Sequence, residues 1–473
     1  MTLRRTLIAI ALLVGSAAGA ADYPGTIASL QAQARDSNLA LRGEALNVRS
    51  ASAALDQAKA AYRPTISLSA RYSRADGGRV QSLPVGDLVN PAYRTLNELL
   101  RAQGLPSRFN DIANQEIQFL REREQDTKLS LSQPIYAPAI AASIRAASAG
   151  LDAADAGRDA FARRLDRDIE VAYLNYLSAH EAVSIVEASA ALLAENRRVN
   201  QVLFDNGKVT LDQVLRAKAE VLAVEQQQLE AMNQRELAQS YLNFLLNKPL
   251  DSEIARVDVP EPKALADRTL GKLASDLDAA NNARFEAQGR SARDELRQLD
   301  AATRATQAQV DIERASFLPT VGFAVDAGIQ GEDYGFGSGQ NYAIASLVLN
   351  WTVFDFGARK AAVSAAVARS EAAEVQRQDI ANQVALDVRQ AADRLRTALR
   401  SLDTAAARRA AAEEGFRIAS KKRDAGSIAQ VEFIDARTAL TNAELNDNLT
   451  RFSALVRLAE LSAALALRQG EPQ

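Results

Sequence analysis

The sequence predicts a mainly α-helical protein that also carries a few membrane β-strands, arranged as two internal repeats. Three observations lead to this fold class. Long stretches rich in Ala, Arg, Gln, Glu and Leu contain few Gly or Pro residues, which favours helix. Two pairs of short segments alternate between apolar and polar residues, as strands with two unlike faces do. The same order of elements occurs in both halves of the chain.

The first segment, residues 1–21, has the layout of a cleaved secretory signal. Arg4 and Arg5 precede an apolar run from Leu7 to Val14, and small residues follow that run. The run is too short to span a membrane as a helix. We therefore expect an exported mature chain.

Composition narrows the classes of function. The chain has 473 residues, of which 47% are hydrophobic, and a formal net charge of -3. This charge gives no electrostatic basis for binding nucleic acid. The absence of cysteine excludes disulfides, thiolate metal sites and a lipid-modified N-terminal cysteine. No apolar stretch of about 18 residues follows the signal, so we expect no transmembrane helix.

The first repeat, residues 22–248, is expected to begin with a helix and to continue through barrel strands at about 63–73 and 126–136. A long helical hairpin, residues 139–248, follows these strands. Its first helix lacks proline and would extend about 100 Å at roughly 1.5 Å per residue. Gly207 follows this helix, as a left-handed cap does, so the second helix is expected to return antiparallel.

A second copy of this pattern follows a segment rich in proline, residues 249–270, which we expect to link the repeats in the equatorial region. Gly426 takes the place of Gly207 at the end of the second long helix. The second repeat, residues 271–467, is expected to contain a helix, barrel strands at about 318–329 and 342–354, a helical hairpin at 359–467, and then a tail at 468–473.

The two faces of the strands favour a membrane barrel over a soluble sheet. Ile66 and Leu68 alternate with Ser67 and Ser69, which is the lipid-out, lumen-in pattern of outer-membrane strands. A soluble antiparallel sheet shows the same alternation, but the apolar stripes of the helices look too narrow to cover one. Aromatic residues also gather at the strand ends next to the helices, as a membrane interface requires. They are Tyr62, Tyr136, Phe317, Trp351, Phe354 and Phe356.

Four strands are too few to close a barrel. Open sheet edges are not tolerated in lipid, because each unpaired backbone group costs several kcal/mol there. Single-chain bacterial barrels begin at about eight strands. The chain is therefore expected to pool its strands with other copies of itself, so that two copies supply eight strands and three supply twelve.

Together these features resemble the TolC family of outer-membrane efflux and export proteins. The resemblance rests on the repeated junction of strand, aromatic residue and helix, "LSLSQPIYAPAIAA" and "LVLNWTVFDFGARKAA", and on the Gly-x-Val and Gly-x-Ile turns of the hairpins. It implies a homotrimer, with a 12-stranded β-barrel in the outer membrane continuous with an α-helical barrel in the periplasm of a Gram-negative cell. The implied function is a passive exit duct from the periplasm to the outside, for efflux or type I secretion.

The same resemblance implies partners and site residues. The partners are outer-membrane lipid, a periplasmic adaptor protein and an inner-membrane transporter of RND, ABC or MFS type, with no nucleic acid and no cofactor. Eight residues at the hairpin turns match adaptor-docking positions, although turn geometry alone would explain their glycines. They are Asn206, Gly207, Lys208, Val209, Ala425, Gly426, Ser427 and Ile428.

Glu432 and Asp435 match acidic positions that line the periplasmic aperture in that family. Their spacing places both on one helix face, so three copies would present two rings of carboxylates that favour cations. A plain solvated helix face is the alternative. The chain departs from the family pattern at Arg423, where an aromatic residue is usual, so a different latch made of Asp212, Arg216 and Arg423 is expected.

Residues 76–125 form a long insertion between the first two strands, at the extracellular mouth if the hairpin turns lie in the periplasm. The segment "PAYRTLNELLRAQG" within it predicts a short helix. A lid over the mouth and an inert surface loop both fit this sequence.

No catalytic motif is present in the sequence, so no enzyme is expected. His180, the only histidine, lies on the apolar stripe of a long helix. It is expected to be packed there rather than to act as a base or metal ligand. The alternative function is a soluble periplasmic coiled-coil adaptor or scaffold, which would not need alternating strand pairs with aromatic ends. The exported cargo and the partner pump stay open.

Overall fold

The computed structural model describes residues 22–271 and 282–467, so the expected signal and tail lie outside the described residues. The chain divides into two compact units. The sheet unit contains Ala54–Ala147 and Gln307–Ala368, and the helical unit contains the other described residues.

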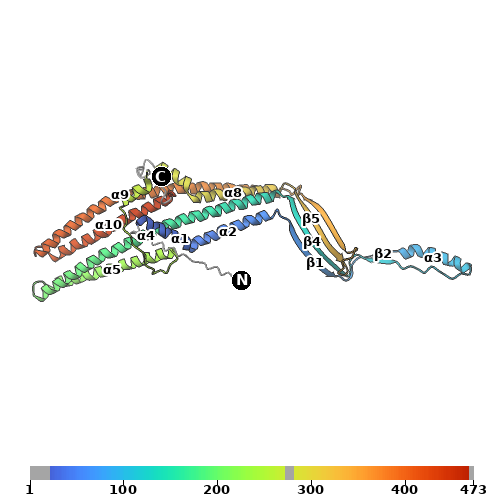
Figure 1. The fold of residues 1–473 in the computed structure, drawn as a ribbon, viewed down its shortest axis with the longest axis horizontal. Helices are drawn as coiled ribbons and strands as arrows, with labels where there is room; N and C mark the ends of the chain where they lie inside the picture. Colours follow the sequence, from blue (N-terminus) through green and yellow to red (C-terminus); the bar gives the residue numbers. More distant parts are fainter. Residues whose placement is uncertain (1–21, 272–281, 468–473) are drawn as a thin grey trace, which may run out of the picture. The chain divides into compact units, whose positions relative to one another are not determined.

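The elements follow one another in a similar order in both repeats, except that the first repeat has an insertion between its two long strands (Figure 1). The first repeat contains α1 (Tyr23–Ser37), α2 (Leu39–Ala60), β1 (Thr65–Arg74), β2 (Val80–Leu83), α3 (Val85–Ala102), β3 (Gln115–Gln118), β4 (Arg123–Tyr136), α4 (Pro138–Asp205) and α5 (Leu211–Leu245). The rest of the chain contains α6 (Pro262–Leu270), α7 (Asn282–Ala292), α8 (Asp294–Ala315), β5 (Thr320–Gly331), β6 (Asn341–Asn350), α9 (Ala358–Asp424) and α10 (Gln430–Ala464).

Four strands of the sheet unit form one antiparallel sheet in the order β1-β4-β5-β6. Its register places Leu68 opposite Leu129, Leu129 opposite Ala327, and Ala327 opposite Ala343 on one face. The adjacent row, Ser67, Ser130, Asp326 and Ile344, is mainly polar and lies on the other face. The predicted alternation therefore extends across β1, β4 and β5 and gives the sheet one apolar face and one mainly polar face, although β6 places Ile344 and Val348 on the mainly polar face.

The last strand is shorter than expected from the sequence. The sequence predicts a strand at about 342–354, but β6 ends at Asn350, which is paired with Thr320 at the start of β5. Pro319 precedes Thr320 and has no N–H, so it cannot donate the hydrogen bond that would lengthen the ladder. Residues 351–354 consequently have no strand partner, and α9 begins shortly after them.

The junction between β6 and α9 is a tight turn built around Asp355. Its carboxylate accepts the backbone N–H of Gly357 at 3.2 Å and that of Arg359 at 2.9 Å, so it caps the helix. Phe356 and Gly357 both have positive φ, of 53° and 95°. This turn lets an aromatic strand end pass directly into an alanine-rich helix.

The insertion of the first repeat is an ordered extension of the β1–β4 hairpin. It contains β2 paired with β3, and α3, which starts at Val85, earlier than the sequence predicts. Because β4 begins at Arg123, the insertion is also shorter than expected. Residues 75–122 are called the arm below.

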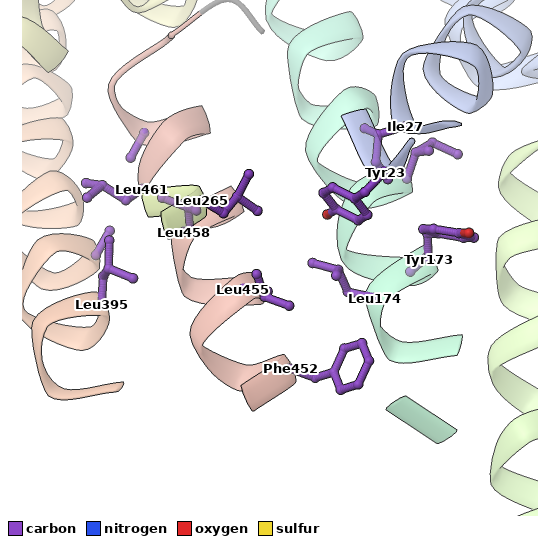
Figure 2. Packing of buried hydrophobic residues seen from close by; sticks show 14 of the residues in the cluster. Tyr23, Ile27, Tyr173, Leu174, Leu265, Leu395, Phe452, Leu455, Leu458 and Leu461 are labelled. Atoms are coloured by element: carbon purple, nitrogen blue, oxygen red, sulfur yellow. The ribbon is translucent and has the colours of Figure 1, made fainter. Parts of the chain in front are cut away.

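The main core lies in the helical unit, where α1, α4, α5, α6, α7, α9 and α10 meet. Figure 2 shows part of it, with Leu265 of α6 beside Leu458 and Leu461 of α10. The segment expected only to link the repeats thus contains a helix that contributes buried side chains to the core. Beyond this cluster the described hairpins are held by smaller groups, such as Val186, Leu193, Val221 and Val224.

One described helix, α4, contains an 18-residue stretch apolar enough to cross a membrane by length and composition. This helix was not expected from the sequence to be a membrane-spanning candidate, because alanine rather than larger apolar residues supplies much of it. Core helices of water-soluble proteins meet the same criterion. The side chains of Leu165, Ile169 and Tyr173 on α4 are buried against other helices of the helical unit.

Candidate functional site

The two hairpins of the helical unit end in the same backbone turn. Gly207 and Gly426 have φ of 67° and 65°, in the left-handed region. In the first turn Lys208 N donates to Leu203 O at 2.8 Å and Gly207 N donates to Phe204 O at 2.8 Å. The second turn repeats both bonds through Ser427 and Gly426, at 2.8 and 2.9 Å. These are Schellman caps, so the prediction of glycine caps is confirmed.

We predict that Gly426→Ala destabilises the protein, although no atom lies within 4 Å of the added methyl group. The left-handed conformation costs an alanine roughly 1–2 kcal/mol. Gly415 in the interior of α9 has equally open surroundings but ordinary helical geometry. Gly415→Ala should therefore stabilise by roughly 0.5–1 kcal/mol. Thermal unfolding followed by the helical circular dichroism signal compares them, and shifts of the same sign would contradict this account.

Most residues of the two turns face solvent. Asn206, Gly207 and Lys208 are exposed, as are Ala425, Gly426 and Ser427, while Val209 and Ile428 are half-buried. Asn206 Nδ2 donates to Val202 O at 2.7 Å, and Ser427 Oγ donates to Lys422 O at 3.1 Å. The turns therefore present two similar, accessible surfaces. Their docking role stays a prediction.

The acidic pair lies at the start of α10 on its exposed side. Glu432 and Asp435 are exposed, whereas Phe433, Ile434 and Arg437 of the same two turns are buried. In the described part of the chain neither carboxylate forms a hydrogen bond or ion pair. Glu432 also lies in the first helical turn, where the helix dipole favours a negative charge. The pair is thus free to face a lumen or solvent.

The three residues expected to form a latch are not joined within one copy. Asp212 accepts a hydrogen bond from the Thr210 hydroxyl, and Arg216 is exposed with no partner among the described residues. The Arg423 guanidinium lies 3.5 Å from Asp424 and 4.0 Å from the ring centroid of Phe433. A latch that uses these residues would have to join different copies, and it stays a prediction.

A ladder of two arginines and two phenylalanines joins α9 and α10 near their turn. Arg423 of α9 stacks on Phe433 of α10, the two phenylalanine rings lie 5.6 Å apart, and Arg437 of α10 lies 5.4 Å from the Phe416 ring of α9. Both arginines use cation–π contacts, which stabilise more strongly when desolvated. The ladder fixes the rotation of α10 and so keeps the acidic pair on the outside.

Arg437 is the more buried of the two arginines in that ladder. Arg437 Nε donates to Ser189 Oγ of α4 at 3.3 Å, and Thr441 Oγ1 donates to the same oxygen at 3.0 Å. Burial lowers the pKa of the Arg437 side chain. This group of residues was not predicted from the sequence, although the four-residue spacing of Phe433 and Arg437 places both on one helix face.

His180 is half-buried and pairs with an arginine rather than with a carboxylate. Arg256 Nη1 lies 2.7 Å from His180 Nε2, and the Tyr176 ring makes an edge contact. Burial, and then the charges of Arg256 and Arg235, lower the pKa of His180. The Arg256 guanidinium can only donate, so the ring nitrogen is the acceptor of this hydrogen bond. Across residues 22–271 and 282–467 no group of three or more His, Asp or Glu residues is placed to hold a metal ion.

The six predicted interface aromatics flank the strands of the sheet unit at the ends joined to helices. Trp351 Nε1 donates to Phe317 O at 3.1 Å, and the rings of Phe354 and Phe356 meet edge to face at 4.6 Å. Tyr136 is exposed at the end of β4, and Tyr62 is half-buried beside it, donating to Ala137 O at 3.2 Å. A membrane-interface role stays a prediction for all six.

Comparison with known proteins matches the chain to a protein family. A family model described as outer membrane efflux protein matches residues 30–248 and 287–467. A curated relative, protein CyaE of Bordetella pertussis, is 30% identical over 179 residues, which cover 37% of this chain and 38% of that protein. The matched part therefore spans well under two thirds of that relative.

Two solved outer-membrane channels are similar in fold. The channel CmeC of Campylobacter jejuni has a TM-score of 0.72 at 16% identity, with 100% of this chain and 95% of that chain covered. The channel MtrE of Neisseria gonorrhoeae, solved in an open state, has a TM-score of 0.71 at 20% identity, covering 93% and 88%. At these identities the likeness concerns the fold.

Proposed function

The chain belongs to the outer membrane efflux protein family, and we propose that three copies of it form a passive duct from the periplasm to the outside of the cell. The four strands of each copy would pool into a twelve-stranded barrel in the outer membrane. The long hairpins would line a helical tunnel in the periplasm. In this proposal the chain is not an enzyme, and outer-membrane lipid surrounds the barrel.

The observation that carries this proposal is the open sheet. β1 and β6 are its two edges, and each has a strand neighbour on one side only. The apolar face of the sheet is exposed in a single copy, including Leu68 and Leu347. An apolar face suits lipid, but unpaired edges do not. Pairing β1 of one copy with β6 of the next removes every edge.

An exposed stripe of leucines on α5 supports the same assembly. Aligning the repeats at Gly207 and Gly426 brings three α5 residues level with three α10 residues, namely Leu215, Leu222 and Leu229 with Ile434, Thr441 and Asn448. The α10 face is buried, with Thr441 bonded to Ser189 and Asn448 to Ser178 of α4. The α5 leucines are each more than half exposed. The repeat therefore suggests that α5 packs on α9 of the next copy as α10 packs on α4.

We also infer the partners from the exposed hairpin turns and the acidic pair. The two turns of each copy would give a trimer six similar surfaces for a periplasmic adaptor protein. That adaptor would connect the duct to an inner-membrane transporter of RND, ABC or MFS type, which supplies the energy. Glu432 and Asp435 would ring the periplasmic entrance and favour cations. Efflux of small molecules and type I secretion of polypeptides both fit this assembly.

A soluble periplasmic scaffold is not favoured. The family match covers both repeats, and a water-soluble protein would have to cover the apolar face of the sheet. The test is to purify the mature chain in mild detergent and to record currents in planar bilayers. Discrete cation-preferring channels are expected. Protein found only in the soluble fraction, with no channels, would contradict the proposal.

A further inference from the structure

The arm is a hydrogen-bonded extension of the β1–β4 hairpin. The ladder of β1 and β4 continues past Arg74, since Ala75 N donates to Glu122 O at 2.9 Å. After a short interruption Phe119 N donates to Arg79 O at 3.0 Å, and β2 pairs with β3. The arm joins β1 after Arg74 and β4 before Arg123, which are the strand ends opposite those joined to α2 and α4 (Figure 1).

The segment of the arm between α3 and β3 is held to α3 by side-chain amides. Asn90 Nδ2 donates to Ile112 O at 2.8 Å, and Asn90 Oδ1 accepts Ile112 N at 2.8 Å. Asn97 does the same for Phe109, at 2.6 and 3.1 Å. A Cβ at Gly86 would lie 2.2 Å from Ile112 O, so only glycine allows this close approach. The polar face of α3 therefore packs against the segment that contains Phe109 and Ile112.

The opposite face of α3 is apolar and is not covered by any described part of the chain. Leu88 is 77% exposed, Leu99 is 57% exposed and Leu96 is 42% exposed. At 100° per residue Leu88 and Leu99 lie within about 20° of each other, and Leu96 lies beside them. The asparagines face the other way. Burying a leucine is worth roughly 1.5–3 kcal/mol, so this face favours contact with an apolar partner.

We propose that the arms of neighbouring copies pack on one another through this leucine face, so that three α3 helices close the outer mouth of the duct. This inference rests on the assembly proposed above. β1 is an edge strand of the sheet, so each arm would rise beside β6 of the next copy. The arm contact would thus continue the contact between copies that the open sheet edges already require.

The charges of the arm favour another copy of the chain over lipid as the partner of the leucine face of α3. A helix that lies on a membrane surface typically carries Lys or Arg along its polar face and Trp at its edge. Residues 75–122 contain neither Lys nor Trp, and their arginines are balanced by acidic residues. Arg94 is moreover paired with Asp111 at 2.8 Å. Such a surface has no excess positive charge for anionic headgroups.

Cysteine cross-linking tests the proposal directly, because the natural chain contains no cysteine. Leu99→Cys places a thiol on the leucine face, and Arg101→Cys places one on the opposite side of the same exposed turn. Both variants are purified as the intact assembly and oxidised mildly. Leu99→Cys should give roughly ten-fold more disulfide dimer than Arg101→Cys, since a disulfide needs Cα atoms within about 7 Å.

The assembly itself is measured separately by native mass spectrometry of the same samples. Intact trimers in which Leu99→Cys forms no more dimer than Arg101→Cys would overturn the arm contact. This result would not contradict the proposed duct. Failure to find trimers would instead overturn the proposed function. A membrane-impermeant maleimide distinguishes lipid as the occupant. Leu99→Cys shielded in outer-membrane vesicles but reactive in detergent, without dimer, would also overturn the proposal.

Discussion

The double variant Glu432→Gln/Asp435→Asn is expected to lose most of the cation preference of the channel. In a trimer it removes six carboxylates from the entrance, and none of them has a hydrogen-bond or ion-pair partner within the described part of the chain. Rings of carboxylates set ion selectivity in cation pores. The permeability ratio of K⁺ to Cl⁻, measured from reversal potentials in a salt gradient, should fall severalfold toward unity.

The salt dependence of the same effect provides a second check. The Debye length is about 10 Å at 0.1 M and about 3 Å at 1 M, so the difference between variant and native channels should shrink in concentrated salt. Glu413→Gln is the matched control, because Glu413 is an exposed carboxylate on α9 of the same hairpin. Equal selectivity in native and double-variant channels at low salt would contradict the acidic aperture. Both variants should fold, since exposed substitutions cost within about 0.5 kcal/mol.

The second large effect is expected from an arginine on the apolar face of the sheet. Leu68 lies near the middle of β1, opposite Leu129, and is 73% exposed in one copy. If this face meets lipid, Leu68→Arg should cost roughly 2–4 kcal/mol per copy. A trimer carries the change three times. The yield of folded, heat-resistant trimer in the outer membrane should drop sharply.

Ser67→Arg is the control for this prediction. Ser67 is the next residue along β1 and lies on the mainly polar face, opposite Ser130. There an arginine would face water in the lumen, beside charges such as Lys128 and Asp326, which lie 3.7 Å apart. This variant should assemble and change the selectivity of the barrel. Equal losses of trimer for both substitutions would show that neither face is the lipid face.

Local patterns predicted the elements that depend on neighbouring residues. Alanine-rich stretches gave the long helices, and alternation gave the faces of the strands. The glycine after each long helix gave the turn, because only the left-handed region closes it. The end of β6 was misjudged, because its ladder stops where the partner strand β5 begins, at Thr320, which follows Pro319.

Contacts between residues far apart in the sequence could not be predicted in this way. The ladder of Arg423, Phe433, Phe416 and Arg437 forms only when α9 and α10 lie side by side. The role of α6 in the core likewise depends on α10, because its short proline-led sequence is typical of a linker. In the sequence, the leucines of α5 form an ordinary apolar helical stripe. Only the structure shows that this stripe is exposed in a single copy.

The account rests on three copies sharing one barrel, and the number of chains in the purified complex tests this most directly. Native mass spectrometry of the mature protein, released from mild detergent, should give a single species of three chains. Three chains supply twelve strands and pair every β1 with a β6. A stable single chain inserted in the membrane would contradict the account, because its two sheet edges would then face lipid unpaired.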